Sequence, residues 1–143
     1  MSFRDIAAIA GSAMTAQTVR LNTVASNLAN AQSASSTEDA TYHARKPVFA
    51  SVMDQGGFRA GDGHGHGAQV RVLDVVQSTE PLRKVYEPDN PLANEQGEVF
   101  YPNVNSVAEM TDMMSASRAF ETNVEVLGRV KSMQQSLLKL GDA

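Results

Sequence analysis

Two histidines, His64 and His66, are the residues whose spacing could serve metal chemistry. In an extended strand, side chains two positions apart point the same way and could bind one ion. A zinc site needs a third and a fourth ligand, however, and only Asp62 lies close in sequence. The surrounding segment 54–69 is rich in glycine, and the chain has no HExxH motif. We therefore expect a solvated loop there, with no metal site and no cofactor.

Residues that could form a catalytic arrangement are scattered along the chain. Serine, histidine and aspartate all occur, but no GxSxG motif presents a nucleophile. The chain has no cysteine, which excludes thiol chemistry and disulfides. The carboxylate pairs Glu109/Asp112 and Glu121/Glu125 have the spacing of a solvated helix face. We expect no catalytic site, and hence a protein that is not an enzyme.

The bulk composition narrows the class of protein further. The 143 residues fit one domain, and the net charge of −4 is mild. A nucleic-acid binder would show a basic stripe, which is absent. No segment is long and apolar enough to span a membrane. At the N-terminus one arginine beside one aspartate, followed by an interrupted apolar run, argues against a cleavable signal peptide.

The C-terminal segment 101–140 organises the rest of the chain. Asn103, Asn105 or Ser106 could cap its start, and Gly141 follows its end. Apolar residues recur in it three or four positions apart, the period of one helix face: Met110, Met113, Phe120, Val124, Leu127, Val130 and Leu137. A helix of roughly nine turns with one apolar face is not stable alone in water and needs a partner.

That partner is a second predicted helix over residues 3–31. Its apolar residues fall on two heptad positions, interrupted by one polar residue, Gln17. Between Ile6 and Thr37 the only charged residue is Arg20. The other face carries small polar side chains: Ser12, Thr15, Thr18, Asn22, Ser26, Asn27 and Asn30. Because a solvated face normally carries charged pairs, we expect this face to pack against other chains.

A short β-rich insert separates the two helices. Residues 32–41 lack periodicity and predict a loop. Four strands are expected: 48–53, at an edge because of Pro47; 69–77, central or bulged; 82–86, as the antiparallel partner of 69–77; and 98–101. The predicted fold is mainly α with a small β insert, in which paired long N- and C-terminal helices, coiled-coil-like, enclose the β-rich segment.

The domain organisation follows from these elements. It is an N-terminal helix in 1–31, a linker and β insert in 32–100 with its Gly/His-rich loop at 54–69, and a C-terminal helix in 101–143.

Two stretches carry a resemblance to a known family. Residues 21–30 read LNTVASNLAN, and residues 101–105 read YPNVN, continuing through SASR at 115–118 and NVEVL at 123–127. On these motifs the chain resembles the bacterial flagellar rod, hook and axial proteins over essentially its whole length. The middle of the chain and its short length fit a proximal rod member. The stretch 61–67 has no counterpart, and Thr122 and Ser136 stand where Ala- or Leu-like residues are expected.

The resemblance implies a structural subunit of the flagellar basal-body rod, in the periplasmic space. Such subunits polymerise helically into a tube that transmits torque and conducts exported subunits, with paired terminal helices as its inner wall. The implied partners are copies of the chain itself, other proximal and distal rod subunits, and the protein at the junction of MS ring and rod. The flagellar type III export apparatus would secrete the chain without a cleaved signal.

The residues then suggest folding that is coupled to assembly. Long helices with little core of their own should be partly disordered until neighbours cover them. Intrachain helix packing is assigned to Leu21, Val24, Leu28, Phe120, Val124 and Leu127. Contacts with neighbouring subunits are assigned to Asn22, Asn27, Asn30 and Asn123. The alternative is a soluble coiled-coil adaptor or secretion chaperone, which would form a well-folded small oligomer with charged outer helix faces.

Overall fold

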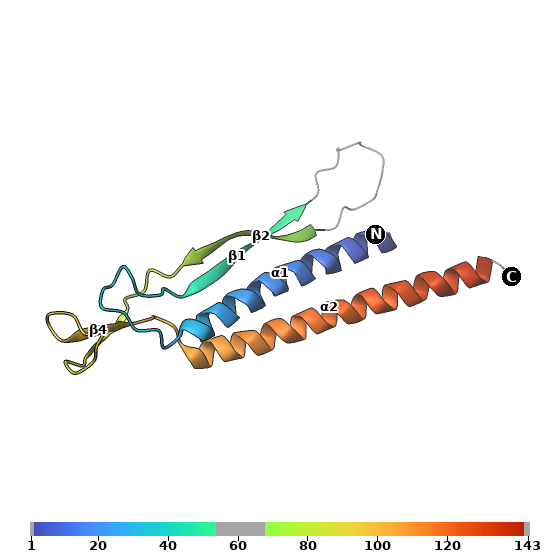
Figure 1. Ribbon diagram of the computed structural model, residues 1–143. Coiled ribbons are helices and arrows are strands. Elements are labelled where there is room, and N and C mark those ends of the chain that lie inside the picture. Colours follow the sequence, from blue (N-terminus) through green and yellow to red (C-terminus); the bar gives the residue numbers. More distant parts are fainter. Residues whose placement is uncertain (1, 54–67, 142–143) are drawn as a thin grey trace.

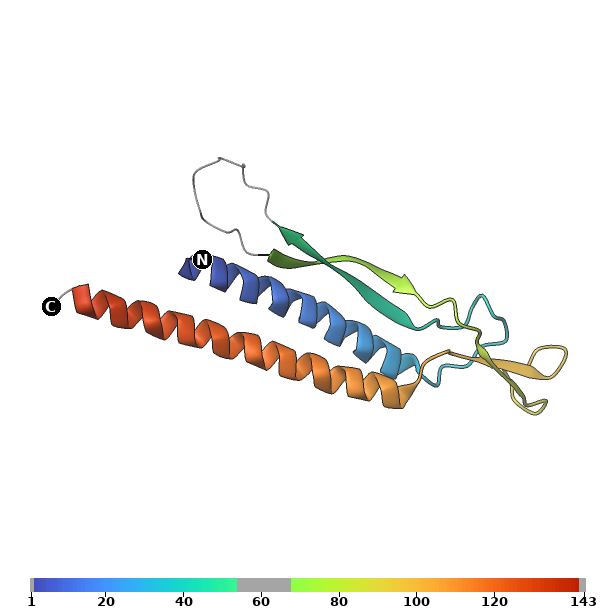
Figure 2. The same ribbon diagram turned by 180° about the vertical axis from the view of Figure 1, so that it is seen from behind.

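Two long antiparallel helices form the body of the protein. The computed structural model describes residues 2–53 and 68–141. Helix α1 spans Phe3–Asn30 and helix α2 spans Ser106–Gly141. They lie side by side, and a β-hairpin runs along α1 on the side away from α2 (Figures 1 and 2). The predicted pairing of the terminal helices and the fold class are confirmed.

Both helices begin at residues that cap them. Ser2 and Asp5 form a capping box at α1, in which the Ser2 Oγ accepts from the Asp5 N–H and an Asp5 carboxylate oxygen accepts from the Ser2 N–H. At α2 the Asn105 Oδ1 accepts from two backbone amides of the first turn, at 3.1 and 3.2 Å. Asn105 is therefore the cap among the three candidates in the sequence.

Helix α2 packs against α1 and against no other helix or strand in the described part of the chain. Its buried side follows steps of four and three residues through Ala116, Phe120, Asn123, Leu127 and Val130. The sequence prediction for Val124 needs correction, because its side chain is 46 % exposed. The packing stripe runs through a small and a polar residue, which a ranking of positions by hydrophobicity passes over.

The hairpin beside α1 consists of β1, Arg45–Met53, and β2, Ala68–Gln77. Val48 pairs with Asp74 and the next residue, Phe49, pairs with Val72, so Leu73 has no partner across the ladder. This β-bulge is one of the two arrangements predicted for this strand. The predicted Gly/His-rich loop is 54–69: residues 54–67 lie outside the described residues, and its last two residues, 68 and 69, belong to β2.

A second hairpin extends beyond the helix ends (Figure 1). It joins β3, Arg83–Tyr86, to β4, Glu98–Tyr101. The prediction that segment 82–86 pairs with segment 69–77 is wrong: β2 is already paired with β1, and the turns after β3 return the chain directly. One of those turns needs Gly97, whose φ of 77° favours glycine and whose carbonyl accepts from the Glu87 N–H at 2.9 Å.

Candidate assembly surface

Asn27 connects helix α1 to the first strand. Its Oδ1 accepts from the Arg45 N–H and from the Tyr42 hydroxyl, both at 2.9 Å, and its Nδ2 donates to the Arg45 carbonyl at 2.8 Å. The side chain is 1 % exposed. The structure thus gives Asn27 bonds within the chain, in place of the contact with a neighbouring subunit that the sequence suggested.

Asn103, which lies just before helix α2, also bonds to the backbone near the start of β1. Its Oδ1 accepts from the Ala44 N–H at 2.7 Å, and its Nδ2 donates to the Glu80 carbonyl at 2.8 Å. Two asparagines, one near the end of α1 and one just before α2, therefore hold the backbone of residues 44–45. Sequence reasoning considered Asn103 only as a helix cap, and no pattern in one sequence distinguishes a cap from such a bond.

Besides Asn27, the sequence assigned three asparagines to contacts between subunits, and these three differ in their exposure. Asn30 is half-buried and donates to the Ser26 carbonyl at 2.9 Å. Asn123 is half-buried on the side of α2 that faces α1 and donates to the Ala119 carbonyl at 2.7 Å. Asn22 is exposed. It is the residue of the four whose position best suits a contact with another chain.

The small polar face of α1 is partly covered by the chain's own β-hairpin. The Ser12 Oγ accepts from the Val70 N–H at 3.2 Å, and the Ser26 hydroxyl lies 3.1 Å from that of Tyr42. The expectation that other chains cover this whole face is therefore corrected for these positions. Small size still has a physical role there, since it lets the strand backbone approach the helix. Thr15, Thr18 and Asn22 stay exposed.

The strongest surface feature is the set of exposed apolar side chains on α2. Eight of its large apolar side chains are exposed within the described chain: Val107, Met110, Met114, Val124, Met133, Leu137, Leu138 and Leu140. Every residue from 131 to 141 is exposed. The reason is length, because α2 has 36 residues and α1 has 28, so the end of α2 extends past α1 (Figure 2). We refer to residues 131–141 as the overhang.

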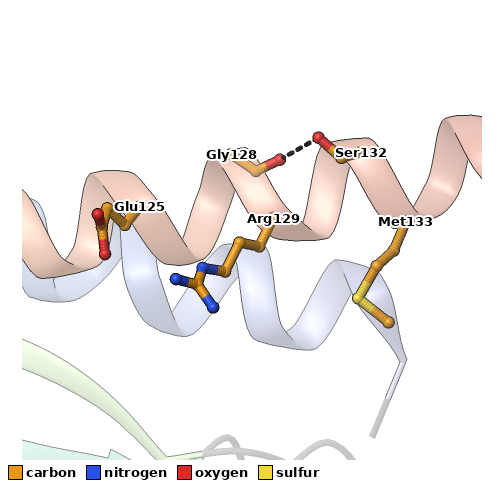
Figure 3. Close-up of a pocket in the computed structure, with 5 residues that line it drawn as sticks. All are labelled: Glu125, Gly128, Arg129, Ser132 and Met133. Carbon is orange, nitrogen blue, oxygen red and sulfur yellow. Dashed lines mark hydrogen bonds between the residues drawn. The ribbon is translucent and has the colours of Figure 1, made fainter.

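A shallow hollow marks the start of this overhang. It is lined by residues of α2 alone (Figure 3): Glu125, Gly128, Arg129, Ser132 and Met133. Gly128 leaves the space because it has no side chain, and its carbonyl accepts a bond of 3.0 Å from the Ser132 hydroxyl. With polar groups from one helix face only, the hollow suits a protruding side chain better than a small-molecule substrate.

Gly128→Ala should stabilise α2. A Cβ built at this position meets nothing within 4 Å. Alanine in a helix interior is favoured over glycine by about 1 kcal/mol, so the free energy of unfolding should rise by about that amount. Urea unfolding followed by circular dichroism measures it. The matched control, Gly141→Ala, lies at the helix end and should change little; a loss of stability in Gly128→Ala would contradict the open surface.

One ion pair joins the two helices, and a separate electrostatic contact lies in the region of the second hairpin. Arg20 of α1 forms an ion pair with Asp112 of α2, and the Arg20 Nε donates to Oδ2 at 3.0 Å. This hydrogen bond raises the pKa of Arg20 above its ordinary value. Because both groups are partly exposed, the pair contributes at most about 1 kcal/mol. In the hairpin, desolvation and then the charge of Glu87 raise the pKa of Tyr101.

The described residues contain no cluster of three or more histidine, cysteine or acidic side chains suited to a metal ion. His64, His66 and Asp62 lie outside them. Neither of the two described helices combines the length and hydropathy of a membrane span.

Comparison with known proteins gives a consistent set of relatives. Residues 8–32 match the family described as flagella basal body rod protein, and residues 95–140 match the C-terminal family of the flagellar basal body rod FlgEFG proteins. The chain is 47 % identical over 141 residues to the flagellar basal-body rod protein FlgC of Escherichia coli, with 99 % of both chains covered. It is 43 % identical to FlgC of Yersinia enterocolitica, again with 99 % of both covered. FlgC of Borreliella burgdorferi is 32 % identical over 92 % of this chain and 93 % of its own.

Proposed function

This chain belongs to the FlgC family of flagellar basal-body rod proteins, and we propose that, as a structural subunit of that rod, it polymerises helically with its neighbours. The resulting tube transmits torque and conducts exported subunits. The family and the basal-body location rest on full-length similarity. The polymer, the torque and the channel are the proposal.

The exposed apolar side chains of α2 carry this proposal. Monomeric soluble proteins rarely expose much contiguous apolar surface, and such surface marks protein–protein contacts. Here eight large apolar residues of one helix are exposed, while α1 is the only helix or strand in the described chain that packs on α2. A tube of neighbouring helix pairs would bury them.

The same reasoning supports folding that is completed by assembly. Within the described chain the Gln17 Oε1 is buried without a hydrogen-bond partner, which costs about 1–3 kcal/mol. The helix pair is assigned to Leu21, Val24, Leu28, Phe120 and Leu127, and Asn22 is assigned to a contact between subunits. We expect the isolated chain to be less helical than two full helices require. The flagellar type III apparatus would then export it without a cleaved signal into the periplasmic space.

The partners we propose are copies of this chain, other proximal and distal rod subunits, and the protein joining the MS ring to the rod. We propose no catalytic activity and no cofactor.

The test places a point mutation on the outer side of α2. Met114→Asp, expressed in a bacterium that lacks its own FlgC, should abolish swimming and incorporation into purified basal bodies, because it buries a charge between subunits. Ser115→Asp is the matched control, because Ser115 is the next residue along α2 and is also exposed. Normal motility of Met114→Asp would sink the proposed role of this surface.

A solution measurement separates the proposal from the adaptor or chaperone alternative. At low protein concentration, where self-association is weak, sedimentation and far-UV circular dichroism of the purified chain should give a small species with helicity below that of the assembled fold. A fully helical, discrete oligomer that is absent from purified basal bodies would favour the adaptor.

A further inference from the structure

The overhang combines apolar and basic side chains. Met133, Leu137, Leu138 and Leu140 are between 53 % and 75 % exposed. From 131 to 141 the sequence contains two cations, Lys131 and Lys139, and no carboxylate. Asp142 follows outside the described residues. This end of the protein is therefore an apolar helix surface with a local positive charge.

The opposite end of the protein is acidic. Segments 31–46 and 78–105 contain seven carboxylates and four cations, so this end carries a net negative charge. Two of the cations, Arg83 and Lys84, lie over the rings of Tyr101 and Phe100, at 4.9 and 5.1 Å from the ring centres. Two large apolar side chains of the same end, Tyr86 and Leu92, are exposed. We refer to this region as the acidic end.

These two surfaces cannot meet within one chain. The acidic end projects past the start of α2, and the overhang lies at the far end of the same helix (Figures 1 and 2). We propose that the overhang of one copy binds the acidic end of a second copy, so that subunits associate head to tail. This contact deepens the proposed rod function and rests on it.

Physical considerations favour a second copy as the occupant. Each surface carries the charge that the other lacks, and complementary charge sets the orientation and rate of association. The exposed leucines of one end and Tyr86 and Leu92 of the other supply apolar area to bury. The contact uses two different patches, so it does not close into a two-fold dimer but repeats as an open helical array.

The experiment uses two charge-reversed versions of the full chain. In the first, Lys131→Glu and Lys139→Glu make the overhang acidic. In the second, Asp89→Lys and Glu95→Lys make the acidic end basic. Each alone should self-associate at least about tenfold more weakly than the unmodified chain in sedimentation at low salt. Mixed together, they should associate again, because each end then meets an opposite charge.

The matched control reverses one exposed charge midway along α2, Arg118→Glu, and should leave self-association unchanged. Recovery in the mixture excludes misfolding as the cause of the single defects. If the mixture stays dissociated while both variants are folded, or if the unmodified chain binds vesicles containing phosphatidylserine but not itself, the proposed contact is overturned. Incorporation of both variants into basal bodies would refute the contact and leave the rod function standing.

Discussion

Asn27→Leu is expected to release the start of β1 from helix α1 and to lower the free energy of unfolding by about 2–4 kcal/mol. Leucine has a similar size but neither donates nor accepts. The Arg45 N–H and carbonyl and the Tyr42 hydroxyl lose the partner shown in the structure. A buried polar group left without a partner costs about 1–3 kcal/mol. The two backbone groups of Arg45 are left in this way, whereas the Tyr42 hydroxyl keeps the Ser26 hydroxyl at 3.1 Å.

Urea unfolding gives the stability change, and amide hydrogen exchange at Arg45 locates it. Asn22→Leu on the exposed side of the same helix is the matched control and should change stability by less than about 0.5 kcal/mol. Equal stabilities of Asn27→Leu and Asn22→Leu would rule out the junction described for Asn27.

A motility defect of Asn27→Leu has a different meaning from the one that the sequence suggested. The sequence placed this asparagine among contacts with neighbouring subunits, so a defect would have reported lost assembly. In the structure its bonds lie within the chain, so the same defect reports a subunit that fails to fold at its junction. Asn22→Leu is then the variant that tests a contact between subunits directly.

The helices could be predicted because their signals are local. Apolar residues at helical spacing, a capping box at Ser2 and a cap just before Ser106 determine where each helix lies. The bulge in β2 is one of the two alternatives, central or bulged, that its partly apolar faces predict. Pairing of strands is not local, and there the prediction for segment 82–86 failed, because many antiparallel partners satisfy the same alternation.

The candidate surface was only partly predictable for a related reason. Asparagine, serine and threonine can bond to another chain, to a strand of their own chain or to their own helix backbone, and sequence does not distinguish these. Ser12 and Asn27 bond to the hairpin backbone, and Asn30 and Asn123 bond to the backbone of their own helix. Asn22 is exposed to solvent. The overhang follows from the difference in helix lengths, which the predicted segments 3–31 and 101–140 already contain.

Ala116→Leu is expected to separate the two helices. Ala116 is 0 % exposed, and α1 is the only helix or strand in the described chain that packs on α2. Three additional carbon atoms at this position have no space, and overpacking of a tight contact costs about 1–3 kcal/mol or more. Because α2 has no second contact among these elements to hold it, we expect the strain to be relieved by displacement of the whole helix.

Spin labels measure this displacement directly, and the absence of native cysteine makes labelling specific. Labels at Thr18→Cys and Ser115→Cys, two exposed positions on facing helices, should give a longer and broader distance distribution in Ala116→Leu. Ala108→Leu is the same substitution at an exposed site of α2 and should leave the distribution unchanged. An unchanged distribution in Ala116→Leu would mean that the helix contact accommodates leucine at this point without the helices moving apart. The cost of insertion would then be local, and α2 would be held by the rest of its stripe through Phe120, Leu127 and Val130.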